Sequence, residues 1–328
     1  MRDLLAISDL SRGEIEQICE RAASFAAVGQ REIKKVPTLR GRTIVTLFYE
    51  SSTRTSASFE LAAKRLSADV ISIKAQGSSV DKGESLKDTV ATLTAYDPEA
   101  IVIRSPEAGA AQLVAGWTDA SVVNAGDGKH EHPSQALLDT YTLLDRLGPL
   151  DGKQIWVVGD IAHSRVARSC VRAFGLMGAE VTVAGPPTLI PRGFGEALGC
   201  EVRYDLDEIG SADVIYALRM QLERMSESYV PSLREYAAAY QIGPRRLGSR
   251  QLLMHPGPVN RGVELAPEVI DGPASLITAQ VRNGLLVRMA ILYEILAGTD
   301  RPRPVRSIDG GGDAARDSED SPTIGEPA

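Results

Sequence analysis

Short apolar runs alternate along this chain with segments in which apolar residues recur at helical spacing. Residues 43–48 form a compact β-branched and apolar run that is typical of a buried strand. Similar runs, each predicted to be a strand, occupy residues 69–73, 100–103, 122–123, 154–158, 180–184, 213–217 and 252–255. Their number and spacing indicate more than one sheet.

Helical patterns lie between most of these runs. Ser11 and Glu14 have the spacing of a capping box, and Ile15, Ile18 and Ala22 then recur on one helical face. Further helical patterns cover residues 85–96, 134–147, 164–178 and 275–297. Strands that alternate with helices predict an α/β fold with parallel sheets and crossover helices.

Turn signals near the middle divide the chain. Residues 145–153 combine Gly, Pro and Asp, which favours a boundary between two α/β units, each a parallel sheet flanked by helices. A length of 328 residues also suits two domains. From residue 305 the chain is rich in Gly, Asp, Ser and Pro and almost free of aliphatic residues, so we predict a disordered acidic tail over 305–328.

Composition narrows the classes of function. The net charge of −7 argues against a general affinity for nucleic acid. We find no signal-peptide pattern and no apolar run of bilayer length, so we expect a cytoplasmic protein that does not enter membranes. Cys19, Cys170 and Cys200 are far apart and lack CxxC spacing, which favours structural thiols.

Hydroxyl and arginine side chains cluster after the first predicted strand. Ser52, Thr53, Arg54 and Thr55 lie where that strand gives way to a helix. The free N–H groups of a first helical turn, these hydroxyls and the Arg54 fork would all suit an anion. The alternative is a Ser- and Thr-rich helix cap beside a solvated arginine.

Other polar side chains also follow predicted strands or open helices. Ser78 and Lys82 lie in a glycine-flanked loop, where a lysine can reach outward or be merely solvated. The remaining candidates are Arg104, His132, Gln135, Arg165, Arg219, Gln221, Arg224, Gly257 and Pro258. The ends of parallel strands meet at one edge of a sheet, which is where ligands bind in such folds.

Metal and dinucleotide chemistry are not favoured by the motifs. His130 and His132 are close in sequence, but no matching acid or thiol cluster accompanies them, so we predict no metal site. The glycine of GDIAHSR, residues 159–165, does not form GxGxxG, and a nicotinamide or flavin fingerprint is therefore missing.

Six motifs in a fixed order carry a family resemblance. STRT, SSxxKGE, HPSQALLD, GDxxHSR, RMQxER and HPGPxNRG together resemble the catalytic chains of aspartate carbamoyltransferases, over nearly the whole chain to about residue 297. The resemblance implies transfer of a carbamoyl group from carbamoyl phosphate to L-aspartate in pyrimidine synthesis, without a cofactor. It implies a homotrimer whose active sites are shared between subunits.

The same resemblance implies a division of labour. A carbamoyl-phosphate-binding domain would span 1–147, completed by a C-terminal helix at about 275–300, and an aspartate-binding domain would span 148–274, with interdomain helices between them. The residues implied to contact carbamoyl phosphate are Ser52, Thr53, Arg54, Thr55, Ser78 of a neighbouring subunit, Arg104, His132, Gln135, Gly257 and Pro258. Those implied to bind aspartate are Lys82 of a neighbouring subunit, Arg165, Arg219 and Gln221. Glu50 and Arg224 would help to hold the domains closed.

The residue types suit this chemistry on independent grounds. Both substrates are anions, so a net-acidic protein must gather arginines in one cleft. As the amine adds to the carbonyl carbon, the oxygen gains negative charge, which Arg104, Thr55 and His132 are suited to stabilise. No covalent nucleophile is required, because phosphate is a good leaving group.

Two alternatives remain at this point. An ornithine-type carbamoyltransferase shares STRT and HPxQ, but HCLP and an SMG loop would be expected where this chain has HPGP and RMQ. A catalytically silent scaffold homologue is the other, although none of the candidate charged residues is missing. Ser56 and Ser105 stand where the family commonly has arginine and histidine. Association with regulatory chains or dihydroorotase is left open.

Overall fold

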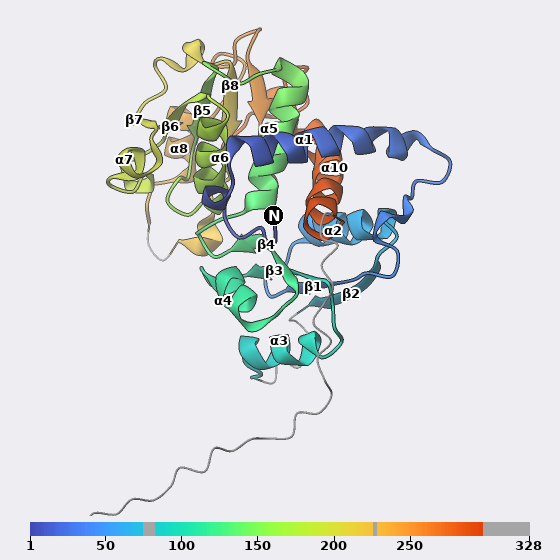
Figure 1. The fold of residues 1–328 in the computed structure, drawn as a ribbon. Coiled ribbons are helices and arrows are strands. Elements are labelled where there is room, and N and C mark those ends of the chain that lie inside the picture. Colours follow the sequence, from blue (N-terminus) through green and yellow to red (C-terminus); the bar gives the residue numbers. More distant parts are fainter. Residues whose placement is uncertain (75–82, 226–227, 298–328) are drawn as a thin grey trace, which may run out of the picture. The chain divides into compact units, whose positions relative to one another are not determined.

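The described part of the chain contains two parallel β-sheets with helices on their faces (Figure 1). The computed structural model describes residues 1–74, 83–225 and 228–297. Ser78, Lys82 and the predicted acidic tail at 305–328 lie outside these described residues. The predicted α/β fold with two parallel sheets is confirmed.

The first sheet has the strand order β2-β1-β3-β4, all parallel. Its strands are β1 Thr43–Phe48, β2 Asp69–Lys74, β3 Ala100–Ser105 and β4 Ser121–Asp127. The helices that follow them are α2 Thr53–Arg65, α3 Leu86–Thr94, α4 Ala110–Trp117 and α5 Pro133–Leu147. Each strand–helix junction lies at the same carboxyl edge of the sheet, because all four strands run in one direction.

The second sheet has the order β7-β6-β5-β8-β9, again all parallel. Its strands are β5 Gln154–Val158, β6 Glu180–Ala184, β7 Glu201–Arg203, β8 Val214–Ala217 and β9 Leu252–Met254. The helices are α6 Arg165–Leu176, α7 Phe194–Leu198, α8 Leu233–Tyr240 and α9 Pro267–Ile270. Short 3₁₀ helices occur at Ile7–Asp9, Ala27–Gln30, Pro37–Leu39, Pro187–Leu189, Ile209–Ser211 and, as η7, at Leu222–Arg224.

Three helices connect the two sheets. α1 Arg12–Ala26, α5 and α10 Ile277–Leu296 pack against one another, and Figure 1 shows them between the first and second sheets. The apolar core continues through this layer: Ile44 and Val102 of the first sheet and Ile155 and Val157 of the second belong to one buried cluster. The predicted interdomain helices are thus present, while the predicted boundaries at 147 and 274 stay a prediction.

The buried runs explain why most strands could be predicted from the pattern. β1, β5 and β6 have the predicted bounds, and their residues are almost all buried. β7 was missed because it has three residues, none of them fully buried, at the edge of the sheet. α4, α7, α8 and α9 were also missed; each has eight residues or fewer, which leaves too few turns for a clear helical period.

Local capping fixes where two important helices begin. In α1 the Ser11 hydroxyl accepts a hydrogen bond from the Glu14 N–H, and the Glu14 carboxylate accepts one from the Ser11 N–H, so the predicted capping box is confirmed. Ser52 caps α2 by accepting from the N–H of Thr55. The first turn of α2 is therefore held at the carboxyl end of β1.

All three cysteines are free thiols. Cys19 and Cys170 are buried, which is consistent with the predicted structural role, and Cys200 is half-buried. Over residues 1–74, 83–225 and 228–297, no helix combines the length and the apolar character needed to cross a membrane.

Candidate active site

The described candidate residues lie at the carboxyl ends of strands from both sheets. Glu50 to Thr55 follow β1, Arg104 is near the end of β3, and His132 precedes α5 after β4. In the second sheet, Arg165 opens α6 after β5, Arg219 to Arg224 follow β8, and Gly257 and Pro258 follow β9. The predicted placement at strand ends is therefore seen in both sheets.

Glu50 forms ion pairs with arginines from both halves of the structure. Its Oε2 lies 3.4 Å from Nε of Arg104 and 2.7 Å from Nη2 of Arg165, and its Oε1 lies 2.7 Å from Nη2 of Arg224. Arg104 comes from the first sheet, whereas Arg165 and Arg224 come from the second. One carboxylate thus holds three guanidinium groups across the junction.

The charges in this cluster act strongly on one another. Burial alone would raise the pKa of Glu50, but the charges of Arg104, Arg165 and Arg224 outweigh it, so its pKa lies below the usual range. Burial, followed by the charge of Arg165, lowers the pKa of Arg104. A guanidinium still keeps its proton in a protein, so the cluster carries excess positive charge.

A glycine makes room for this cluster. Gly126, in β4, has φ +115°, a conformation that side chains rarely adopt. A Cβ there would lie 2.9 Å from Nε of Arg165 and 3.4 Å from Nη1 of Arg104. The two arginines can approach the strand only because it presents bare backbone at this position.

Arg54 forms a second contact between the first sheet and the loop after β9. A Cβ on Gly257 would lie 3.1 Å from the guanidinium carbon of Arg54, so this side chain packs directly against the glycine. Burial and then the positive charge of Arg219 lower the pKa of Arg54. Arg54, Arg219 and Gly257 therefore form a second group whose net charge is positive.

The start of α2 beside Arg54 has the form of an anion site. Thr55 is buried, and its N–H bonds the Ser52 hydroxyl at 3.4 Å. The free N–H groups of the first turn carry the positive end of the helix dipole. Ser56 donates its N–H to the Ser52 carbonyl and leaves this turn helical. The hydroxyl of Ser105 accepts from the Glu107 N–H and stabilises the turn after β3.

His132 and Gln135 lie at the start of α5. Burial and the charges of Arg104 and Arg165 hold the pKa of His132 well below its usual range, so the imidazole is neutral at physiological pH. Gln135 donates its amide N–H groups to both oxygens of Asp139, at 3.1 Å each. The predicted proximity of His132 to the arginines is consistent with these charge effects.

Three further predicted residues are Ser78, Lys82 and Gln221. Ser78 and Lys82 lie outside the described residues. Gln221 donates its backbone N–H to Asp160 at 3.2 Å, which anchors the segment after β8.

The histidines show no metal-binding arrangement. His130 contacts Asp127 through Nδ1 at 3.0 Å. Within residues 1–74, 83–225 and 228–297, no group of three or more His, Cys, Asp or Glu side chains is arranged to hold a metal ion.

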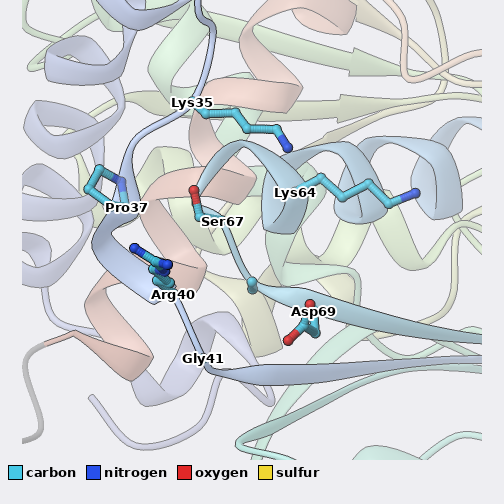
Figure 2. A pocket seen from close by; sticks show the side chains of 8 residues that line it. Lys35, Pro37, Arg40, Gly41, Lys64, Ser67 and Asp69 are labelled. Carbon is cyan, nitrogen blue, oxygen red and sulfur yellow. The ribbon is translucent and has the colours of Figure 1, made fainter.

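A separate groove of about 610 Å³ lies away from these residues (Figure 2). Lys35, Arg40, Lys64 and Asp69 line it, and Figure 2 shows their side chains around the start of β1 and β2. It is therefore at the amino ends of the strands, opposite the edge at which the arginines gather. Its basic side chains are exposed and belong to a different surface.

The structure also adds residues that the sequence analysis did not single out. Asp139, His255 and Gln280 form a buried hydrogen-bonded chain behind the site. Asp139 lies four residues after Gln135, so the shared helical face was an available signal. His255 begins the motif HPGPxNRG, whereas nothing in the sequence around Gln280 indicated a role.

Comparison with known proteins adds an independent line of evidence. Residues 2–145 match the family model "Aspartate/ornithine carbamoyltransferase, carbamoyl-P binding domain". Residues 151–295 match "Aspartate/ornithine carbamoyltransferase, Asp/Orn binding domain", and this match includes all but the last residue of α10.

Individual relatives agree with these matches. A curated aspartate carbamoyltransferase catalytic subunit from Salinispora arenicola is 55% identical over 307 residues, covering 92% of this chain and 100% of the relative. Aspartate transcarbamoylase from Trypanosoma cruzi, solved with carbamoyl phosphate and aspartate, aligns with TM-score 0.81 and 30% identity over 90% of this chain and 97% of that one. The catalytic subunit from M. jannaschii gives TM-score 0.80 and 34% identity over 91% and 99%.

The Glu50 cluster generates a stability prediction. Replacing Glu50 with Gln leaves three arginines at the junction without their counter-charge, and we expect the free energy of unfolding to fall by on the order of 3 kcal/mol. Because the pKa of Glu50 is lowered in the folded state, its contribution is present at neutral pH and is lost as the pH falls through that pKa. Denaturant unfolding at neutral and acidic pH measures both effects.

Glu60→Gln provides the matched control. Glu60 pairs with Lys64 at 2.6 Å on the exposed side of α2, where an ion pair contributes little. We expect this control to change stability by no more than about 0.5 kcal/mol. If the Glu50 and Glu60 variants had equal free energies of unfolding, the ion cluster around Glu50 would not stabilise the fold.

Proposed function

Because the chain belongs to the aspartate/ornithine carbamoyltransferase family, we infer that it transfers the carbamoyl group of carbamoyl phosphate to the amine of L-aspartate. The products are N-carbamoyl-L-aspartate and phosphate, an early step of pyrimidine synthesis. The observation that carries this inference is the gathering of arginines from both sheets at one edge of an acidic protein. Two anionic substrates need such a site.

Carbamoyl phosphate is held by the first domain. Its phosphate binds at the start of α2 through Ser52, Thr53, Arg54 and Thr55. Burial and then the charge of Arg219 lower the pKa of Arg54, which supports this, because a bound anion would stabilise the charged guanidinium against both effects. The carbamoyl group lies toward Arg104, His132 and Gln135, and the backbone of Gly257 and Pro258 borders it. The packing of Arg54 on Gly257 supports a single pocket for the two halves.

Aspartate is held mainly by the second domain. Arg165, Arg219 and Gln221 bind its carboxylates, together with Lys82 from a neighbouring subunit. A diamine such as ornithine would bring a positive side chain to these arginines, so the charge of the site disfavours it. The names of the similar catalytic subunits also support aspartate.

The reaction requires alignment more than a reactive side chain. The neutral amine of aspartate attacks the carbonyl carbon, and the bond from that carbon to the phosphate oxygen breaks. Thr55, Arg104 and the neutral His132 stabilise the negative charge that develops on the carbonyl oxygen. The departing phosphate accepts a proton from the amine. Alignment is worth on the order of 7–11 kcal/mol, compared with about 3–4 kcal/mol for a single donor.

Glu50 and Arg224 keep the two domains closed around the substrates, and the 2.7 Å ion pair between them supports this role. The functional unit is a homotrimer in the cytoplasm, in which Ser78 and Lys82 of one subunit complete the site of the next. Higher assembly with regulatory chains or with dihydroorotase is compatible with this trimer.

Substrate choice is the first test. We expect the purified protein to form N-carbamoyl-L-aspartate and phosphate from carbamoyl phosphate and L-aspartate, with no added cofactor, and to leave L-ornithine unchanged. Colorimetric detection of the ureido product and of phosphate measures both reactions. Turnover with ornithine but not with aspartate would overturn the inference.

Removing Arg54 tests the phosphate site. Arg54→Ala should lower kcat with aspartate by at least about 100-fold, because a preorganised donor to the departing phosphate is lost. The matched control is Arg40→Ala, an exposed arginine of the groove in Figure 2, which should retain the native rate. Normal turnover by a folded Arg54→Ala protein would remove Arg54 from the site.

Mixed trimers test the sharing of sites between subunits. Each site is proposed to take Arg54 from one chain and Lys82 from its neighbour, so a trimer of Lys82→Ala and Arg54→Ala chains contains one native site. After dissociation and reassembly of the two inactive variants we expect up to about a third of native activity. Mixing Lys82→Ala with the double variant Arg54→Ala/Lys82→Ala is the control, because no native site can form. Inactive mixtures in both cases would contradict the shared site.

A further inference from the structure

A fully buried carboxylate lies directly behind the proposed carbamoyl site. Asp139, on α5, has no exposed surface. Its Oδ1 accepts from Gln135 at 3.1 Å and from Gln280 at 2.7 Å. Its Oδ2 accepts from Gln135 at 3.1 Å, from the Tyr216 hydroxyl at 2.6 Å and from the Cys170 thiol at 3.5 Å. The four partners come from α5, α10, β8 and α6.

All of these partners donate, so Asp139 acts as an acceptor. Burial raises its pKa to about 6, and the four donors hold it back from rising further, so the group is mainly a carboxylate at neutral pH. A carboxylate offers about four lone-pair positions, which matches this set of donors. Burying a carboxylate costs free energy of desolvation. A role for Asp139 is therefore sought in the side chains that it orients.

The first thing it fixes is the orientation of the Gln135 carboxamide. An amide has its nitrogen and oxygen on opposite branches. Because the Gln135 nitrogen is bound to Asp139, its oxygen is directed away from Asp139. His132 caps α5 and Gln135 lies in its first turn, so the two residues share the end of the helix at which the carbamoyl site is proposed.

A second branch of the chain reaches the loop after β9. The Gln280 amide nitrogen donates to Asp139, and its oxygen accepts from the backbone N–H of His255 at 3.0 Å. His255 in turn accepts from the N–H of Gly257 at 2.8 Å through Nδ1, the unprotonated nitrogen of its ring. Gly257 is the residue on which Arg54 packs. One carboxylate therefore orients groups on both sides of the pocket.

We propose that Asp139 is a positioning residue that makes Gln135 present its carboxamide oxygen, an acceptor, to the amino group of the carbamoyl substrate. This proposal rests on the proposed function. An acceptor at this position distinguishes carbamoyl phosphate, which carries N–H donors, from acetyl phosphate, which has a methyl group in the same place. A site that hydrogen-bonds a substrate N–H binds an analogue without that group poorly, because its own polar atom is then unpaired.

The variant Asp139→Asn tests the orientation directly. The Gln135 nitrogen lies 3.1 Å from both carboxylate oxygens, so in the variant it faces one oxygen and one NH₂ group. The Gln135 carboxamide then makes one matched and one mismatched contact whichever way it is turned, so residue 139 no longer selects one of its two orientations. In the turned-over orientation its NH₂ group faces the carbamoyl amino group.

The measurement is the KM for carbamoyl phosphate beside the inhibition constant of acetyl phosphate. In Asp139→Asn we expect the KM to rise about three- to tenfold, because only part of the protein then presents the Gln135 oxygen, whereas the inhibition constant of acetyl phosphate changes less than about twofold. Gln135→Met should give the same split, and adding Asp139→Asn to Gln135→Met should change the KM no further. A KM in the double variant that rises clearly above that of Gln135→Met alone would overturn the proposal.

Tyr216→Phe is the matched control. It removes one buried donor to Asp139 but leaves the carboxylate, so Gln135 keeps its orientation and the KM should stay within about twofold. If Asp139→Asn does not fold, Asp139→Ser replaces it, because the shorter hydroxyl side chain no longer holds the Gln135 amide nitrogen from two oxygens. There too the KM should rise several-fold without a change for acetyl phosphate. Equal weakening of both ligands, or no weakening of either, would show that Asp139 has only a structural role.

Wild-type turnover with carbamoyl phosphate and aspartate distinguishes a failure of the proposed function from a failure of the role proposed for Asp139. Its absence would end the proposed function. With turnover present, only the comparison of the two acyl phosphates bears on Asp139.

Discussion

The structure depends on the ion pairs that the single carboxylate of Glu50 forms with three guanidinium groups. Arg104 belongs to one sheet and Arg165 and Arg224 to the other, so this ion cluster is also a contact between the two halves. Burial by itself would disfavour every charge in it. One negative charge and three positive charges leave a net positive charge, which attracts anions. This charge lies at the edge where the strands of both sheets end.

This imbalance was only partly predictable from the sequence. The strands were predictable because β1, β5 and β6 are continuous buried runs, and the candidates were predictable because they follow such runs. The pairing of Glu50 with Arg165 spans 115 positions along the chain and depends on how two sheets pack, which no local pattern encodes. The motifs therefore identified candidate site residues but not the contacts that these residues make with one another.

Asp139 illustrates a different limit. A polar residue in a helical pattern is normally assigned to the solvated face, yet α5 is buried over its first three turns because it lies between α1, α6 and α10. The helices that surround α5 leave these three turns without a solvated face. The partners of Asp139 come from three other elements, so its role became visible only when α6, α10 and β8 were in place.

The two kinds of polar contact in the site have different consequences for binding. The arginines around Glu50 can exchange partners, because a guanidinium has five N–H groups and Arg165 uses Nη2 for Glu50 and Nη1 for the carbonyl of Gly128. A substrate carboxylate can therefore compete with Glu50 for Arg165 without leaving any charge unpaired. The amide of Gln135 has no such freedom, since its nitrogen is held by both oxygens of Asp139. On the proposed function, adaptable charges attract two anions and close the domains around them, while a fixed amide selects which acyl phosphate is held there.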